Sequence, residues 1–233
     1  MLTILDTPQK PATGSLTERK SEFIGQACHV EDQEAAMAFV QKVRVQHPKA
    51  RHVCHCAIWG PEGRTSERMS DDGEPSGTAG KPILEVMRRQ GVTDCVLTVT
   101  RYFGGILLGS GGLIRAYSSA ASLALKAAKQ ARVLQTQRFT ITVDYPEYDP
   151  LRRLIRTSGG QVETEDFTDQ VRLTYDLEPA AVPAFHGRLD DLLQGRAQPS
   201  ALGEGRRLIP LSGNQASSAA GQAHAARRRS SAM

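Results

Sequence analysis

The chain has 233 residues, of which 39% are hydrophobic and 23% charged, an ordinary composition for a globular protein that buries a core. No apolar run approaches the roughly 20 residues that a membrane-spanning helix needs. The first ten residues lack the basic-then-apolar order of a secretory signal. These features argue against membrane insertion and export, and we expect a cytoplasmic protein.

Charge is distributed unevenly along the chain. Residues 1–135 hold 17 Lys and Arg against 13 Asp and Glu, whereas residues 136–210 hold 9 against 12. Residues 211–233 add three arginines and no acidic residue. We therefore expect any phosphate-binding surface to lie in the first half of the chain.

Hydrophobic periodicity in the first half predicts strands that alternate with helices. One helix follows Asp32, its N-cap, and ends before Pro48. Another begins at Lys81-Pro82, because proline is tolerated in a first helical turn. Residues 60–78 form a long polar connection without structure of its own, which is more often functional than idle. The remaining elements are strands at residues 22–30, 52–59 and 92–100, the last covered on both faces, and an Ala-rich helix at 113–131.

The second half of the chain shows a different order of predicted elements. It predicts a strand (138–144), a helix capped by Asp149, two strands (161–167 and 170–177), a helix (179–193) and a strand (207–211). This β-α-β-β-α-β order is the split βαβ, ferredoxin-like arrangement. The fold class is therefore α+β, with an N-terminal domain over residues 1–134, a C-terminal domain over 135–211 and a disordered basic tail over 212–233.

Four cysteines, Cys28, Cys54, Cys56 and Cys95, all fall in apolar, strand-like stretches. His52, Cys54 and Cys56 share one face of an expected strand, but there is no Cys-x-x-Cys and no second ligand pair at zinc spacing. A Cys–His hydrolase needs a depressed thiol pKa and an orienting third group, and the sequence specifies neither. We expect buried, reduced thiols, and we assign no metal, cofactor or catalytic residue.

Residues 70–82 read SDDGEPSGTAGKP and form the most unusual stretch of the chain. Asp71, Asp72 and Glu74 place three carboxylates within four residues, which suits a cation such as Mg²⁺ or an acid–base pair. They equally suit internal roles, in which they cap turns and pair with Lys81 or Arg101. The residues alone leave these readings open.

The glycines of the same loop favour a helix N-terminus. Gly77 and Gly80 give a flexible connection that feeds the helix starting near Lys81, a position that attracts anions. The loop is not a phosphate-binding P-loop, because the spacing differs and Pro82 stands where a metal-binding Ser or Thr belongs.

Residues 101–115 read RYFGGILLGSGGLIR, in which two glycine clusters flank an apolar turn and the second opens the long helix. Exposed backbone N–H groups there suit a phosphate or a carboxylate. Tyr102 and Phe103 suit stacking on a base. In the alternative reading the aromatics belong to the core, and we favour this for Phe103. The candidate anion or nucleic-acid site comprises Lys81, Arg101, Tyr102, Gly104, Gly105, Gly111, Gly112 and Arg115.

Three motifs in this order resemble the IMPACT family, and its bacterial, YigZ-type branch in particular. They are ARHVC at residues 50–54, SDDGEP with GTAGKP over 70–82, and RYFGG with LG and GGL over 101–113. SEFI at residues 21–24 is similar to the family's opening motif. The resemblance covers about residues 21–211 and leaves the tail outside.

The resemblance implies a fold and a biological setting. The first domain would resemble the second domain of a small-subunit ribosomal protein, with a four-stranded sheet backed by helices. The second would be similar to the ferredoxin-like C-terminal domain of elongation factor G. Eukaryotic relatives regulate translation initiation by competing for an activator of a stress kinase. Some relatives carry a proline-dipeptidase label, for which this sequence offers no metal-binding set.

We expect a non-enzymatic protein associated with translation, which binds RNA, the ribosome or a translation factor and regulates translation. This requires the acidic loop and the two glycine turns to meet in space. One alternative is a metal-assisted hydrolase that acts on a phosphorylated or peptide substrate through Asp71, Asp72 and Glu74. The other is a protein-interaction adaptor that does not bind nucleic acid. No membrane partner and no sequence-specific DNA binding are expected, and the oligomeric state stays open.

Overall fold

A computed structural model of the chain describes residues 1–61 and 63–211. The described chain divides into two compact units: Met1–Arg132 together with residues 209–211, and Val133–Leu208. The boundary falls within strand β7 (Gln130–Val143). The tail expected to be disordered, residues 212–233, lies outside the described residues.

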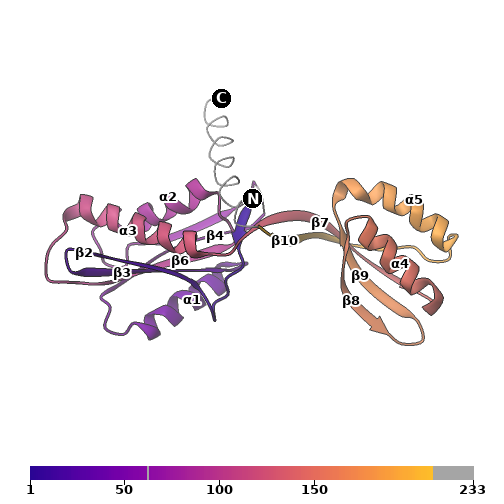
Figure 1. The fold of residues 1–233 in the computed structure, drawn as a ribbon, viewed down its shortest axis with the longest axis horizontal. Coiled ribbons are helices and arrows are strands. Elements are labelled where there is room, and N and C mark those ends of the chain that lie inside the picture. The colour runs from indigo at the N-terminus through magenta and orange to yellow at the C-terminus, as the bar shows by residue number, and fades with distance from the viewer. Residues whose placement is uncertain (62, 212–233) are drawn as a thin grey trace, which may run out of the picture. The chain divides into compact units, whose positions relative to one another are not determined.

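The first unit is built on a five-stranded antiparallel sheet in the order β2-β3-β6-β4-β5. Helix α1 (Gln33–Gln46) covers one face, and α2 (Gly80–Gln90) and α3 (Gly109–Ala127) cover the other (Figure 1). A short strand, β1 (Leu2–Ile4), pairs with the first residues of β7. The sheet strands are β2 (Ala12–Glu18), β3 (Ser21–His29), β4 (His52–Trp59), β5 (Ser66–Ser70) and β6 (Cys95–Tyr102).

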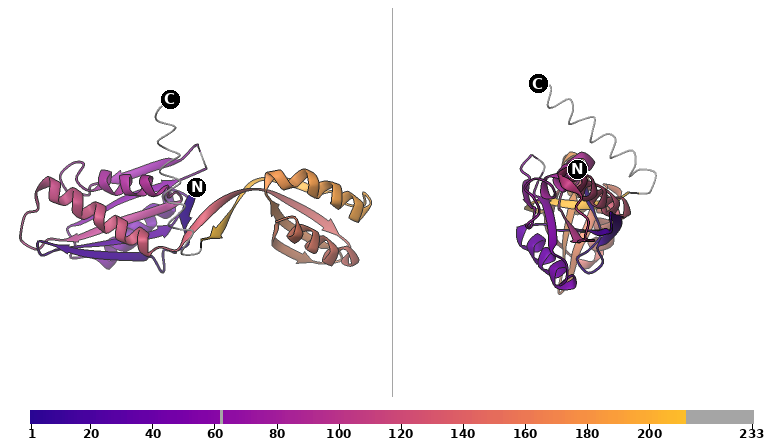
Figure 2. Two further views of the ribbon diagram at one scale, coloured as in Figure 1. Left: turned by 45° about the horizontal axis from the view of Figure 1, so that its top comes forward. Right: turned by 90° about the vertical axis from the view of Figure 1, so that its left-hand side faces the viewer.

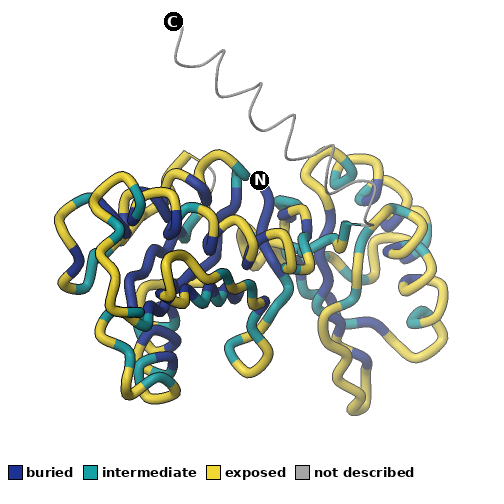
Figure 3. Tube along the Cα trace, turned by 60° about the vertical axis from the view of Figure 1, so that its left-hand side comes forward, coloured by how far each residue is buried: buried dark blue, intermediate teal, exposed yellow. Residues whose placement is uncertain are grey.

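Alternation along β4 divides its side chains between two cores, because successive residues of a strand point to opposite faces. Val53 and Ala57 pack with α1, whereas Cys54, Cys56 and Ile58 pack with α2 and α3. Strand β6 lies at the centre of the sheet and is buried along nearly its whole length. The dark interior of the sheet is visible in Figure 3. The predicted central strand, covered on both faces, is therefore confirmed.

Glycine lets helix α3 lie close to the sheet. A Cβ on Gly25 of β3 would be 2.5 Å from the carbonyl oxygen of Ala120, and one on Gly14 of β2 would be 2.6 Å from the backbone of Leu123. Ala120 and Ala124, both fully buried, complete this small-residue contact from the helix. The Ala-rich composition of α3 thus serves close helix-to-sheet packing.

The second unit has the ferredoxin-like element order. In its sheet β9 (Val171–Leu177) lies between β7 and β8 (Gln161–Phe167), and β10 (Ser200–Pro210) pairs with the other edge of β7. Helices α4 (Tyr145–Thr157) and α5 (Val182–Leu193) pack into one core with the sheet (Figure 2). A single turn of 3₁₀ helix, Pro179–Ala181, precedes α5.

The predicted α+β fold is confirmed, and several expectations need correction. Ser66–Ser70 forms β5 inside the connection predicted to lack structure, so the sheet has five strands rather than the implied four. Strand β2 precedes the first expected strand, and β10 is longer than residues 207–211. Helix α4 starts at Tyr145, not after Asp149, because Asp144 and Glu147 form a capping box at its N-terminus. No helix among residues 1–61 and 63–211 is long and apolar enough to span a membrane.

We predict that Gly25→Ala destabilises the first unit by about 1–3 kcal/mol, because the new methyl group meets the backbone of α3 and forces it from the sheet. The free energy of unfolding, measured by urea denaturation with circular dichroism, checks this.

The control is Gly187→Ala, at an exposed helical glycine in α5 with nothing within 4 Å of the added Cβ. This change is expected to stabilise the second unit by roughly 0.5–1 kcal/mol, since alanine is the better helix former. Equal effects of the two substitutions contradict the packing argument.

Candidate functional site

The loop that joins β5 to α2 turns the Asp71 carboxylate onto the start of the helix. Its oxygens accept hydrogen bonds from the N–H groups of Gly77 (2.8 Å), Ala79 (3.0 Å) and Gly80 (2.8 Å). Burial alone would raise the pKa of Asp71, but these donors outweigh it and hold the pKa below its usual range. The α2 N-terminus, suggested above for an external anion, is thus occupied by a carboxylate of the chain itself.

Asp72 turns toward α1. Its carboxylate accepts hydrogen bonds from Arg44 (2.5 Å) and from the Val53 N–H (2.7 Å). Its carbonyl oxygen lies 2.8 Å from Nδ1 of His52. A carbonyl can only accept, so Nδ1 of His52 carries a proton, and the orientation of this ring is fixed from the loop.

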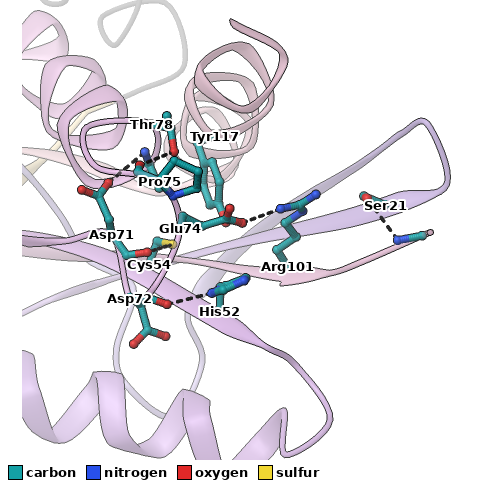
Figure 4. Close-up of polar contacts among 12 residues, drawn as sticks. Ser21, His52, Cys54, Asp71, Asp72, Glu74, Pro75, Thr78, Arg101 and Tyr117 are labelled. Atoms are coloured by element: carbon teal, nitrogen blue, oxygen red, sulfur yellow. Dashed lines mark hydrogen bonds and ion pairs between the residues drawn. The ribbon is translucent and has the colours of Figure 1, made fainter. Parts of the chain in front are cut away.

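Glu74 is buried beneath the loop, where it links three elements (Figure 4). One carboxylate oxygen accepts hydrogen bonds from Nη1 of Arg101 on β6 (2.6 Å) and from the Tyr117 hydroxyl on α3 (2.8 Å). Burial raises the pKa of Tyr117 far above its usual range, with Cys54 and Glu74 adding to the effect. The Tyr117 ring packs edge-on against Phe23 of β3, at 5.2 Å between ring centroids.

Arg101 is almost fully buried and sits between two aromatic rings. Its guanidinium carbon lies 5.5 Å from the Phe23 ring centroid and 5.4 Å from that of Phe103. Its buried Nε has no hydrogen-bond partner within the part of the chain that the structure describes. The side chain is therefore held by an ion pair and two cation–π contacts, and its buried Nε takes no part in the ion pair.

A cleft of about 370 Å³ is lined by this ion pair. Its walls come from segments far apart in the sequence. They are Arg51 and His52 at the start of β4, Glu74 and Pro75 of the acidic loop, and side chains between Arg101 and Leu113. The acidic loop and the segment holding both glycine turns therefore meet in space.

Helix α3 begins in this cleft. Gly109 and Ser110 line the cleft, and Leu108, the residue before them, provides no side-chain cap. The first N–H groups of a helix have no acceptor within it and carry the positive end of its dipole. Within residues 1–61 and 63–211, no carboxylate accepts a hydrogen bond from the first turn of α3, whereas Asp71 does so at α2.

The cleft contains only part of the anion site predicted from the sequence. Arg101 lines it, and Gly111 and Gly112 lie in the first turn of α3. However, the charge of Arg101 is neutralised by Glu74 (Figure 4), and the Gly104 N–H donates to Ser21 at 3.1 Å. The expectation of a free guanidinium and a free amide at these two positions is corrected.

Other predicted residues lie elsewhere. Tyr102 points to the α1 face, where its hydroxyl is 2.9 Å from Nδ1 of His47. Lys81, at the exposed start of α2, and Arg115, exposed on α3, do not line the cleft. Gly105, with φ of +84°, belongs to an exposed turn.

For three residues of the cleft wall, the sequence analysis made a wrong prediction or assigned no role. Phe103 was expected in the core but is 47% exposed. Arg51 has no predicted role beyond its place in the motif at residues 50–54, although it directly precedes the buried strand β4. Leu107, 80% exposed, was read as part of an apolar turn. An apolar run between two glycine clusters, where no helix or strand covers it, signals exposure.

The environments of the thiols and carboxylates give little support to the Cys–His hydrolase and the metal-assisted hydrolase considered from the sequence. All four cysteines are buried and free, and burial raises the pKa of Cys54 to about 12, so this thiol is protonated and a poor nucleophile at neutral pH. Asp71, Asp72 and Glu74 each accept hydrogen bonds from different protein groups. Among the described residues, no group of three or more His, Cys, Asp or Glu side chains could hold a metal ion.

Comparison with known proteins identifies the class. Residues 19–125 match the Impact N-terminal domain, and residues 141–196 match a domain of unknown function, DUF1949. The chain is 37% identical over 200 residues to IMPACT family member YigZ of Escherichia coli K12, covering 84% of this chain and 97% of that protein. It is 34% identical over 183 residues to IMPACT family member YvyE of Bacillus subtilis 168, covering 76% and 82%.

A solved structure supports the same class. The crystal structure of a hypothetical protein aligns with a TM-score of 0.62 and 36% identity over 86% of this chain and 96% of that one. An Impact N-terminal domain followed by a ferredoxin-like domain thus defines the protein. The chain belongs to the IMPACT family.

We predict that the Glu74–Arg101 pair behaves as one coupled unit. Arg101→Met leaves a buried carboxylate unpaired and is expected to cost about 3–5 kcal/mol of folding free energy. Glu74→Gln leaves the guanidinium without its ion-pair partner. The double substitution is expected to cost less folding free energy than the sum of the two single substitutions. Urea unfolding of the four proteins of this double-mutant cycle measures the coupling. Additive losses contradict a buried ion pair at this position.

We predict that Asp71→Asn destabilises the first unit at pH 7 by about 1–2 kcal/mol, as for loss of a helix cap. The lowered pKa of Asp71 means that its stabilisation is present above the unfolded value, about 3.9, and is lost as pH falls through the folded value. The difference in stability between Asp71→Asn and the wild type should therefore become smaller below pH about 4.

Thermal unfolding at several pH values measures this gap. Glu85→Gln, at an exposed position of α2, removes a carboxylate of the same unit and is the control. A gap for Asp71→Asn that is independent of pH contradicts the role of its charge.

Proposed function

We propose that the cleft beside the Glu74–Arg101 pair binds single-stranded RNA, and that the protein acts in translation through this contact. The observation that carries the proposal is the convergence of an uncapped helix N-terminus, the exposed Arg51 and the exposed ring of Phe103 on one cleft. An RNA nucleotide combines a negative phosphate with a flat base, and these are the two features that such a cleft accommodates.

Electrostatics favours the phosphate near the start of α3. The free N–H groups of the first turn and the positive end of the helix dipole attract an anion. Arg51 adds a full positive charge beside them, whereas Arg101 is neutralised by Glu74 and adds little. Attraction therefore comes from the rim and the helix end more than from the floor.

The apolar wall favours a base. Phe103 is half exposed, and Leu107 is exposed over most of its surface. Stacking of a base on an aromatic ring is worth about 1–3 kcal/mol and tolerates any sequence, because every base has a π face. This fits a protein that binds RNA without strict sequence preference.

The translation setting comes from the family. The resemblance described above implies that eukaryotic relatives regulate translation initiation, and this chain belongs to the same family. Contact with RNA or the ribosome would give this chain a direct route to such a role. A purely protein-binding adaptor is the competing outcome.

We predict that Arg51→Ala weakens binding of a fluorescein-labelled, mixed-sequence single-stranded RNA several-fold. It should also lower the slope of log affinity against log salt by about 0.7, the value for one lost phosphate contact on single strands. Fluorescence anisotropy measures both quantities.

Lys81→Ala is the matched control, because Lys81 is an exposed cation of the same unit that does not line the cleft. It is expected to leave affinity nearly unchanged. Equal losses from both substitutions point to diffuse charge attraction and remove the cleft as the site. A pull-down from lysate with and without ribonuclease adds the second test, since partners that survive the nuclease favour the adaptor.

A further inference from the structure

The turn between β2 and β3 carries two basic residues in an unfavourable backbone conformation. Glu18 pairs with Ser21, so Arg19 and Lys20 form a two-residue hairpin turn. Their φ angles are +45° and +63°. Positive φ at both positions suits the twist of a hairpin, and Asn-Gly adopts it readily, whereas the Cβ atoms of Arg and Lys oppose it. The chain keeps two cations where other residues would form this turn with less strain.

The turn is fixed against the cleft. A Cβ on Gly104 would be only 2.0 Å from the Lys20 carbonyl, so glycine permits the close approach of the two segments. Ser21 accepts the Gly104 N–H, and Nη1 of Arg19 lies 3.4 Å from the carbonyl oxygen of Leu107. Because Leu107 lines the cleft, the turn is attached to the cleft wall rather than free in solution.

The two cations are available to a ligand. Arg19 and Lys20 are exposed, and neither forms an ion pair within residues 1–61 and 63–211. Glu22 aligns with Tyr102, which points to the α1 face and away from the cleft, whereas the exposed Glu18 aligns with Ser21 and places one carboxylate on the side of the turn that faces Gly104. The backbone of the turn thus places two cations without an ion-pair partner among the described residues at the edge of the cleft.

We propose that Arg19 and Lys20 bind consecutive phosphates of the RNA strand whose neighbouring nucleotide occupies the cleft. The inference rests on the proposed function and names a second contact point for the same ligand. Backbone strain at non-glycine residues persists where function requires it. A rigid turn loses little entropy when it binds, which makes its cations better phosphate ligands than those on a free loop. Charge kept only for solubility would not need this strained turn.

The test compares two double substitutions in the full-length protein. Arg19→Gln plus Lys20→Gln removes the charge and keeps the strain, whereas Arg19→Asn plus Lys20→Gly removes both. Both proteins should lower the salt slope for the labelled single-stranded RNA by about 1.4, that is about 0.7 for each lost phosphate contact. The Asn-Gly combination should also unfold at a temperature about 2–4 °C higher, because strain is relieved.

Two controls make the result specific. Arg89→Gln plus Lys126→Gln removes the same charge from exposed positions on α2 and α3 and should leave the slope unchanged. Arg19→Lys plus Lys20→Arg keeps the charge and should retain binding. The proposal is overturned if the turn variants bind RNA like the wild type, or if poly-L-glutamate competes as well as RNA. Loss of binding in Arg51→Ala with normal turn variants would overturn this inference alone, whereas absence of RNA binding in the wild type would overturn the proposed function.

Discussion

The buried ion pair between Glu74 and Arg101 is the interaction on which the rest of the site depends. It ties the acidic loop to the central strand β6, and the Tyr117 hydroxyl extends it to α3. A buried pair is not a strong stabiliser by itself, because desolvation offsets much of the attraction, but loss of one partner is costly. We expect the pair to contribute mainly to specificity, by determining which groups meet. It fixes where the loop, the sheet and the helix meet, and so it fixes the cleft.

The Glu74–Arg101 ion pair also changes how the acidic loop is interpreted. In the sequence, three carboxylates in four residues suggest a cation site or an acid–base pair. In the structure, each is directed to a different internal partner: a helix N-terminus, an arginine of α1 and an arginine of β6. Carboxylates that act on a substrate need to converge on one point, and these diverge. The loop is better understood as a clamp that aligns β4, α2 and α3. Its density of charge follows from how many elements it must hold.

Much of the fold could be predicted from the sequence, because strands such as β4 and β6 carry an unbroken buried pattern. Strand β5 could not, since its residues are nearly all exposed at a sheet edge, and β2 is weakened by Gly14 and polar residues. In the site, the loop and glycine turns were predicted, and pairing of a loop carboxylate with Arg101 was one of the readings left open, which a contact across 27 residues decides. Tyr102 was not placed correctly, because the predicted strand ends at residue 100 whereas β6 continues to Tyr102, so the alternation of neighbours between the two faces was not applied to it. The exposure of Phe103 could not be predicted either, since it depends on what covers the turn.

The cleft combines a nearly neutral floor with a positive rim. Because Glu74 neutralises Arg101, the floor would neither attract nor repel a charged group strongly, and in the proposed function an anion would be attracted instead to the α3 N-terminus, Arg51 and the basic turn at Arg19 and Lys20. Those groups are exposed, so their attraction is screened by salt. The apolar wall formed by Phe103 and Leu107 is not screened in this way. A ligand with both phosphates and flat bases would therefore keep residual affinity at high salt, whereas an acidic peptide held by charge alone would be released.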